Sequence, residues 1–195
     1  MKLISLNIEH NLHDELVLPF LEKEEADIIC IQELLEEKLD FYRQKLQTMG
    51  MEGTYQVMAY CSSPSQPELR GKKSGIAIFA KHMAASGAVF FAGSEEYVTG
   101  PFEQFDGNPD FQNNAALLWT DVKSNDGIII KVITTHLPVT KNGSVTPLQL
   151  QVVDSLLANL ATLGEFVLCG DMNAPRGREA FSRLAQVYKD AIPVE

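Results

Sequence analysis

Polar residues that could do chemistry follow four apolar runs of the sequence. An acid and an amide stand two positions apart after the run 167–170, as Asp171 and Asn173. Because side chains alternate along extended backbone, positions two apart can point the same way. Such a pair can hold a water molecule, a metal ion or a phosphate oxygen. Taken alone, the pair is more typical of an Asx turn that ends a strand.

The other three runs end at Asn7, Glu33 and His136. Each residue also has a purely structural interpretation. Asn7 can satisfy backbone groups where its strand ends, Glu33 can be an exposed acid before a helix, and His136 can be a core histidine. The whole set favours chemistry, because catalytic groups are often placed on loops that a rigid scaffold carries.

A divalent cation would give these residues distinct roles, since Mg²⁺ prefers oxygen ligands and needs only one or two carboxylates. Glu33 is the expected direct ligand, and Asn7 supports it by hydrogen bonding. Asp171 can orient a water and accept its proton, while Asn173 holds Asp171 or the phosphoryl group. His136 can stabilise charge on the phosphate. The sequence has no nucleophilic-triad motif, Walker-type loop, dinucleotide glycine fingerprint or zinc-spaced Cys/His cluster.

Length and composition restrict the class of protein. The 195 residues fit a single domain, 1–195, and 45% of them are hydrophobic, as in a globular protein. No apolar run is long enough to span a bilayer, and the N-terminus favours a first strand over a signal peptide. The odd cysteine count predicts free thiols and a cytoplasmic location. A net charge of −10 argues against tight non-specific binding of duplex DNA. It leaves a small anionic substrate open, because a bound cation can reverse the local field.

Hydrophobic periodicity predicts strands and helices that alternate, with one hairpin between them. Strands are expected at 2–8, 27–31, 55–60, 75–80, 88–92, 115–122, 128–135 and just before Asp171. Helices are expected at 12–25, with a kink or boundary at Pro19, and at 36–49, 146–164 and 177–189. Thr146 is expected to cap the third helix. The polar stretch 93–113 is expected to be a long loop, which we hypothesise sets specificity; its aromatic residues could equally cover the core edge.

Five segments resemble the endonuclease/exonuclease/phosphatase superfamily of phosphoesterases: Ser5–Ile8, Ile29–Glu33, Ser74–Ile78, Thr134–Leu137 and Gly170–Ala174. The Ile-Gln-Glu and Gly-Asp-x-Asn pieces are the most specific. The resemblance implies an α/β fold, a four-layered αββα sandwich of two mixed sheets. It also implies hydrolysis of a phosphoester by an activated water, assisted by Mg²⁺, with Mn²⁺ as the alternative metal.

The resemblance carries over residue by residue. Glu33 resembles the metal ligand of the family, and Asn7 resembles the asparagine that supports it. His136 resembles the histidine that acts on the phosphate or the leaving group. Asp171 and Asn173 resemble the pair that orients the attacking water and contacts the phosphate.

Two further groups of residues extend the candidate site. Glu9 stands where some family members carry an Asp, and it is expected to touch the metal through water. Arg70 and Lys72 belong to a basic loop and are candidate phosphate-binding residues, although basic loops are more often simply solvated. The resemblance leaves the substrate open between a nucleic acid, a phospholipid head group and a small phosphate ester.

Family members normally continue beyond the Gly-Asp-x-Asn segment to a Ser-Asp-His-like motif that is central to catalysis. The other histidines, His10, His13 and His82, lie outside any such motif, and the first two are expected at the start of the first helix. We therefore expect a fold that is incomplete at its C-terminus, weak or absent activity in this chain, and an exposed sheet edge open to association. The alternative function is a non-catalytic metal- or phosphate-binding module that keeps the fold.

Overall fold

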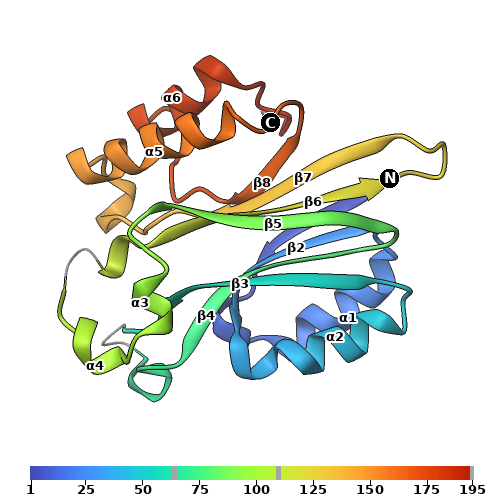
Figure 1. Cartoon of the computed structure of the whole chain (residues 1–195), viewed down its shortest axis with the longest axis horizontal. Coiled ribbons are helices and arrows are strands. Elements are labelled where there is room, and N and C mark those ends of the chain that lie inside the picture. The colour runs from blue at the N-terminus through green and yellow to red at the C-terminus, as the bar shows by residue number, and fades with distance from the viewer. Residues whose placement is uncertain (63–65, 109–110, 194–195) are drawn as a thin grey trace.

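A computed structural model describes residues 1–62, 66–108 and 111–193 of the chain. Two four-stranded sheets pack face to face, and helices cover the outer face of each sheet (Figure 1). Both sheets are mixed, because each has one parallel pair of strands beside antiparallel pairs. The structure confirms the expected αββα sandwich.

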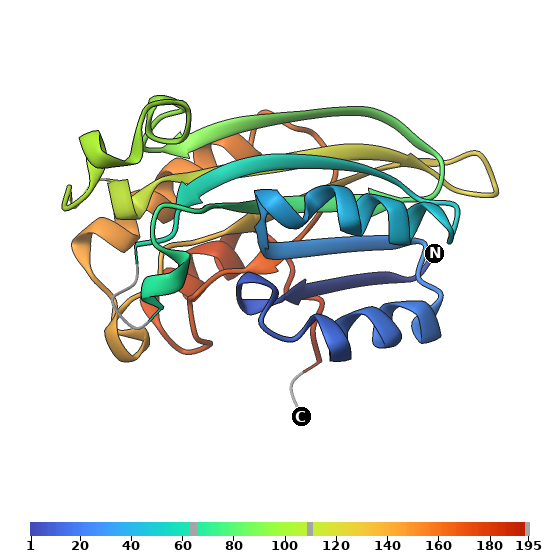
Figure 2. The same cartoon turned by 90° about the horizontal axis from the view of Figure 1, so that it is seen from below.

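The first sheet has the strand order β1-β2-β4-β3, which Figure 2 shows from the side of its helices. Its strands are β1 (Leu3–Asn7), β2 (Ile28–Leu35), β4 (Lys73–Ala80) and β3 (Glu52–Tyr60). Helices α1 (Asp14–Glu24) and α2 (Leu39–Gln47) cover it. Pro19 lies inside α1 and does not end it, so the expectation of a boundary there is wrong.

The second sheet has the order β5-β6-β7-β8. Its strands are β5 (Met83–Ala92), β6 (Ala115–Lys123), β7 (Ile129–His136) and β8 (Val167–Asp171), and helices α5 (Pro147–Leu160) and α6 (Glu179–Val187) cover it. The predicted hairpin is confirmed as β6 and β7. Thr146 caps α5 as predicted, since its hydroxyl accepts a hydrogen bond from the Gln149 N–H at 3.1 Å.

Alternation along β2 divides its side chains between two cores. Ile29 and Ile31 belong to the cluster beneath α1 and α2, where Leu21 is fully buried. Ile28 and Cys30 belong to the cluster between the two sheets. A strand covered on both faces shows a continuous apolar run. Gln32 and Glu33 interrupt this run within β2, because Leu34 and Leu35 beyond them are buried again. The candidate site thus lies at a polar interruption of a buried strand.

The stretch 93–113 is more ordered than the long loop that its polar sequence predicts. It contains α3 (Glu96–Thr99), α4 (Phe102–Phe105) and a 3₁₀ turn at Phe111–Asn113. Phe105 and Phe111 are buried, so the aromatic residues cover the edge of the core, one of the two roles foreseen for them. Further 3₁₀ turns lie at Glu9–Asn11, Glu36–Lys38, Pro67–Leu69 and Lys141–Gly143. In the described part of the chain, no helix is both long and apolar enough to cross a bilayer.

Candidate active site

The carboxyl ends of two parallel strand pairs meet at one place in the sandwich. In the first sheet Asn7 of β1 pairs in register with Gln32 of β2, and in the second His136 of β7 pairs with Asp171 of β8. The Gln32 side chain reaches across and donates to the Thr134 hydroxyl at 2.9 Å. Both pairs therefore deliver their polar residues to the same end of the molecule.

Asn7 lies at the centre of this cluster. Its Nδ2 donates to Oε1 of Glu33 and to Oδ2 of Asp171, each at 3.1 Å. Its Oδ1 accepts a hydrogen bond from the Glu9 backbone N–H at 3.0 Å, which fixes the orientation of the amide. One carboxamide thus holds two carboxylates from different sheets side by side.

Glu33 has an unusual backbone conformation. Its φ is 61°, and the β2–β4 register shifts between Ile31 and Leu34 on either side of it. A non-glycine residue in this left-handed region persists only where the surrounding structure imposes it, and such strain concentrates at functional sites. The irregularity at Glu33 accompanies a carboxylate that faces Asn7, His10 and His136.

Asp171 and Asn173 form a turn and also belong to the site. The Asn173 backbone N–H donates to Asp171 Oδ1 at 2.9 Å, and Asn173 has a φ of 43°. This is the Asx turn that the pair suggested when taken alone. The Asn173 side chain donates to the Leu137 carbonyl at 2.7 Å and lies 3.1 Å from His136 Nε2. The turn therefore places the amide against the histidine.

Gly170 allows β8 to approach β7 this closely. Its φ is 137°, and a Cβ at this position would lie 2.0 Å from the Thr135 carbonyl oxygen. Only glycine fits such a contact, because that distance is far below van der Waals separation. The glycine of the Gly-Asp-x-Asn segment thus sets the position of Asp171 beside His136.

His136 contacts both carboxylates of the cluster. Its Nε2 lies 3.7 Å from Glu33 Oε1 and 3.8 Å from Asp171 Oδ2. Burial lowers the pKa of His136 below its usual 6.5, and nearby His10 acts in the same direction, against the raising effect of Glu33 and Asp171. The imidazole is consequently neutral at pH 7, so Nε2 can accept a hydrogen bond from the Asn173 amide.

This lowered pKa predicts a pH-dependent stability. The unfolded chain protonates this histidine near pH 6.5, whereas the folded protein does so only at lower pH, so acidification in that window favours unfolding. We expect the midpoint of thermal unfolding, measured in EDTA, to fall further between pH 7.5 and 5.5 in the wild type than in His136→Gln. The exposed His82→Gln control should behave like the wild type. Equal decreases in all three proteins would contradict the prediction.

His10 is a member of the cluster that the sequence analysis did not identify. Its Nδ1 lies 3.2 Å from Glu33 Oε2. The expectation that His10 lies at the start of the first helix is wrong, because Glu9, His10 and Asn11 have positive φ and α1 begins at Asp14. His13 does lie at that start, as the N-cap residue of α1. The sequence signal that could have identified His10 is its position three residues after Asn7. The left-handed backbone at three consecutive residues, which brings His10 to Glu33, has no clear sequence signature.

Glu9 contributes its backbone to the cluster, while its side chain points elsewhere. The carboxylate is largely exposed and lies 3.2 Å from His13 Nε2. The backbone N–H orients Asn7, as described above. The structure therefore places Glu9 beside the site without bringing its carboxylate onto Glu33.

Arg70 and Lys72 are each paired with an acid. Arg70 forms an ion pair with Asp106, and its guanidinium lies 5.4 Å from the centroid of the Phe102 ring. Lys72 Nζ lies 2.8 Å from Glu37 Oε1. Neither cation contacts the cluster around Asn7, so their role as phosphate ligands stays a prediction.

The donor set fits a hard divalent cation that keeps most of its water. Among the residues that the structure describes, no three or more His, Cys, Asp or Glu side chains lie close enough together to hold a metal ion by themselves. The carboxylates of Glu33 and Asp171 nevertheless converge, and both remain partly exposed to solvent. One or two carboxylates with several waters is the usual environment of Mg²⁺.

A hollow beside Asp171 and Asn173 gives the cluster an open side. Its volume is about 550 Å³, and its wall includes Thr140, Met172 and Phe181. A reactant that reaches the two residues from solvent would occupy this space.

Comparisons with known proteins agree with this architecture. The family model described as "Endonuclease/Exonuclease/phosphatase family" matches residues 4–191. A search of curated proteins found no match. The human Nocturnin catalytic domain with bound sulfate is similar in structure, with a TM-score of 0.65 and 19% identity over 87% of this chain and 59% of that chain.

Two phosphatases have a similar fold. ANGEL2, a 2′,3′-cyclic phosphatase, has a TM-score of 0.65 and 19% identity over 94% of this chain and 56% of that one. A mannosyl-6-phosphatase from Bacteroides thetaiotaomicron has a TM-score of 0.64 and 13% identity over 95% of this chain and 69% of that one. The chain thus spans less than two thirds of Nocturnin and ANGEL2. With the family model matched along nearly all its length, the chain belongs to the endonuclease/exonuclease/phosphatase family.

Proposed function

We propose that the chain is a Mg²⁺-dependent phosphoesterase that uses an activated water, with Mn²⁺ as the alternative metal. The observation that carries the proposal is the bridge from Asn7 Nδ2 to the carboxylates of Glu33 and Asp171, with His136 Nε2 within 4 Å of both. The gathering of two carboxylates, two amides and an imidazole favours hydrolysis over the alternative of a binding module, which would need only a metal or phosphate ligand.

Each residue has a role that its contacts support. Asp171 orients the attacking water and accepts its proton, while the Asn7 amide and the Asn173 N–H hold its carboxylate in place. Once a substrate displaces the hydrogen bond between Asn173 and His136 Nε2, the Asn173 amide and the Nε2–H tautomer of His136 can donate to the phosphoryl oxygens as negative charge develops on them. Glu33 is the metal ligand. When bound, Mg²⁺ polarises a phosphoryl oxygen and lowers the pKa of a coordinated water.

The substrate is a phosphoester. Two similar structures are a 2′,3′-cyclic phosphatase and a mannosyl-6-phosphatase, which supports this class without selecting among nucleic acids, phospholipid head groups and small phosphate esters. We expect a low rate from the 195-residue chain, because its sequence holds no Ser-Asp-His-like motif.

Metal binding and hydrolysis test the proposal separately. Titration calorimetry with Mg²⁺ and Mn²⁺ should show weak binding by the wild type and at least about tenfold weaker binding by Glu33→Gln, which keeps shape but loses the ligand charge. Hydrolysis should be measured with enzyme in excess over a panel of phosphodiesters and phosphomonoesters, so that a slow single turnover is visible, and EDTA should abolish it.

The exposed Glu22→Gln variant is the matched control and should bind metal like the wild type. Metal binding without hydrolysis of any ester would favour the binding-module alternative. Equal metal affinity in Glu33→Gln and Glu22→Gln would remove Glu33 from its assigned role.

We also propose a cytoplasmic location and association through a sheet edge. The location is supported by the free thiols of Cys30, Cys61 and Cys169, which suit a reducing compartment. The association is supported by β8, which stands at the edge of the second sheet and exposes Val167.

A further inference from the structure

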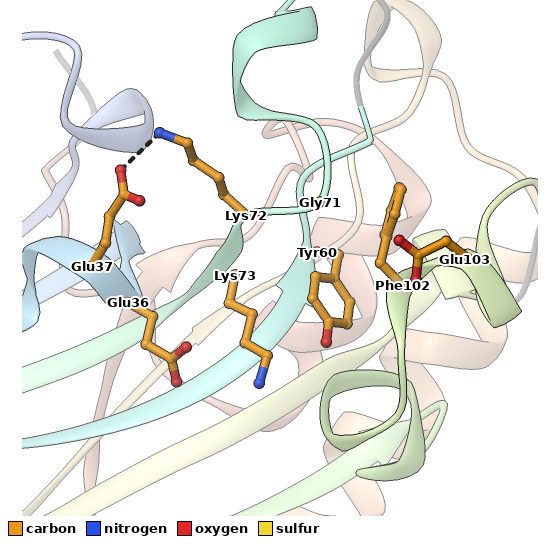
Figure 3. A pocket seen from close by; sticks show the side chains of 8 residues that line it. All are labelled: Glu36, Glu37, Tyr60, Gly71, Lys72, Lys73, Phe102 and Glu103. Atoms are coloured by element: carbon orange, nitrogen blue, oxygen red, sulfur yellow. Dashed lines mark hydrogen bonds and ion pairs between the residues drawn. The ribbon is translucent and has the colours of Figure 1, made fainter.

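A second pocket opens near the candidate active site, with a volume of about 490 Å³. Figure 3 shows its composition: acidic residues from the turn after β2, Lys72 just before β4 and Lys73 at its first position, and Phe102 and Glu103 from α4. Nothing assigned so far to catalysis or metal binding uses this space, apart from the candidate Lys72.

The pocket is close enough to receive part of a substrate held at Glu33. Glu36 follows Glu33 by three residues, so their Cα atoms lie no more than about 11 Å apart. Cys61 lies beside the lysine side of the pocket, because its N–H donates to the Lys72 carbonyl at 2.8 Å.

The charges of the pocket disfavour a second phosphate. Three glutamates and two lysines line it, and Lys72 is neutralised by Glu37 at 2.8 Å. Glu36, Glu103 and Lys73 form no ion pair with the residues that the structure describes. The unpaired carboxylates outnumber the unpaired lysine, and carboxylates accept hydrogen bonds from hydroxyl and amino groups. The pocket is thus suited to neutral donors more than to anions.

Two aromatic rings give the pocket a fixed apolar surface. The Tyr60 and Phe102 rings have centroids 5.5 Å apart at 59°, and both pack on the buried Phe111. The Tyr60 hydroxyl donates to the Gly100 carbonyl at 2.8 Å, which fixes the ring. Lys73 Nζ lies 5.7 Å from the Tyr60 centroid, and Figure 3 shows Glu36, Lys73 and Tyr60 directed toward the same side. A flat ring could rest on the aromatic surface while its polar groups reach the charged side chains.

We propose that this pocket binds a neutral polar ring, carrying hydroxyl or amino donors, that is attached to the scissile phosphate, and that it discriminates against a second phosphate on that ring. The inference rests on the proposed phosphoesterase function and names its substrate class. Sugar phosphates and nucleoside monophosphates share this chemistry. It also gives the segment 93–113 a specific part in selectivity, through Phe102 and Glu103.

The test compares ring-bearing esters with and without a second phosphate. We would measure single-turnover hydrolysis of a hexose 6-phosphate against the 1,6-bisphosphate, of adenosine 5′-monophosphate against the 3′,5′-bisphosphate, and of methyl phosphate as a minimal ester. The wild type should prefer both monophosphates over methyl phosphate and over their bisphosphates. A preference for one ring-bearing monophosphate over the other identifies the ring as sugar or base.

Substitutions of pocket residues test whether the pocket causes the preference for ring-bearing monophosphates. The double substitution Glu36→Gln and Glu103→Gln should reduce discrimination against the second phosphate by about 2- to 10-fold, as expected for two exposed charges. Phe102→Leu keeps an apolar side chain but removes the ring, and should reduce the advantage of ring-bearing esters about tenfold. Glu22→Gln, on the exposed face of α1, should change neither ratio.

The outcomes separate this inference from the function on which it rests. If all five esters are hydrolysed and no pocket variant changes the ratios of their rates, the pocket does not bind the ring. That result would leave the proposed phosphoesterase function standing. If no ester is hydrolysed, the function fails, and saturation-transfer NMR with adenosine and methyl glucoside still tests the pocket. If adenosine or methyl glucoside binds and Phe102→Leu weakens that binding, the result supports ring binding in the pocket. If neither compound binds, the pocket assignment is overturned.

Discussion

Replacing Asp171 with Asn is expected to lower the single-turnover rate of phosphoester hydrolysis by about 100- to 10,000-fold, the usual contribution of a positioned general base. The substitution keeps the size of the side chain, and its Oδ1 can still accept the Asn173 N–H that closes the turn. What is lost is the second carboxylate oxygen that faces Asn7, and with it the ability to take a proton from water.

Two measurements separate this loss of chemistry from loss of structure. Asp126→Asn, in the exposed β6–β7 turn, is the matched control and should hydrolyse substrate at the wild-type rate. Asp171→Asn should still bind Mg²⁺, in contrast to Glu33→Gln. If Asp171→Asn retained more than about a tenth of the wild-type rate, Asp171 could not be the general base.

Replacing Phe111 with Ala is expected to have the largest effect on stability, a loss of about 3–5 kcal/mol in the free energy of unfolding. Phe111 is only 1% exposed and lies at the centre of an aromatic cluster. Its ring centroid is 5.9 Å from that of Tyr60 and 6.0 Å from those of Phe105 and Tyr97. Removing it leaves a cavity under Phe102 and Tyr60 and should also weaken binding in the pocket.

Urea titration followed by circular dichroism measures this loss. Phe41→Ala is the control, because Phe41 is 41% exposed and its ring packs edge-on against Tyr42, so a loss of about 1 kcal/mol or less is expected. Similar losses in the two variants would mean that the cluster around Phe111 contributes little to stability.

The sequence predicted the layers of the fold better than the details of its connections. Apolar runs such as Ile28–Ile31 and the helical stripe that begins after Thr146 depend on local periodicity, which the sequence displays directly. The segment 93–113 was expected to be a loop because it is polar and contains several glycines and prolines. Its order comes from contacts between Phe111 and residues such as Tyr60, which lie far away in sequence. Periodicity carries no information about such contacts.

The same limit applies to the site. Asn7, Glu33, His136 and Asp171 were identified because each follows an apolar run, and such runs are visible in a sequence. His10 was missed because its approach to Glu33 depends on left-handed backbone at Glu9–Asn11, which tertiary packing imposes. The pairing of Lys72 with Glu37 was also invisible, since the sequence shows the cation but not its partner.

The Asn7 bridge has a consequence for the synthesis of the protein on the ribosome. The hydrogen bond from Asn7 to Asp171 joins residues 164 positions apart. Ribosomes add about 5–20 residues per second, so Asn7 leaves the peptidyl transferase centre roughly 8 to 33 seconds before its partner is made. During that interval Asn7 and Glu33 have no second carboxylate to share. The nascent chain therefore carries only one half of the candidate site until β8 has been translated and has docked.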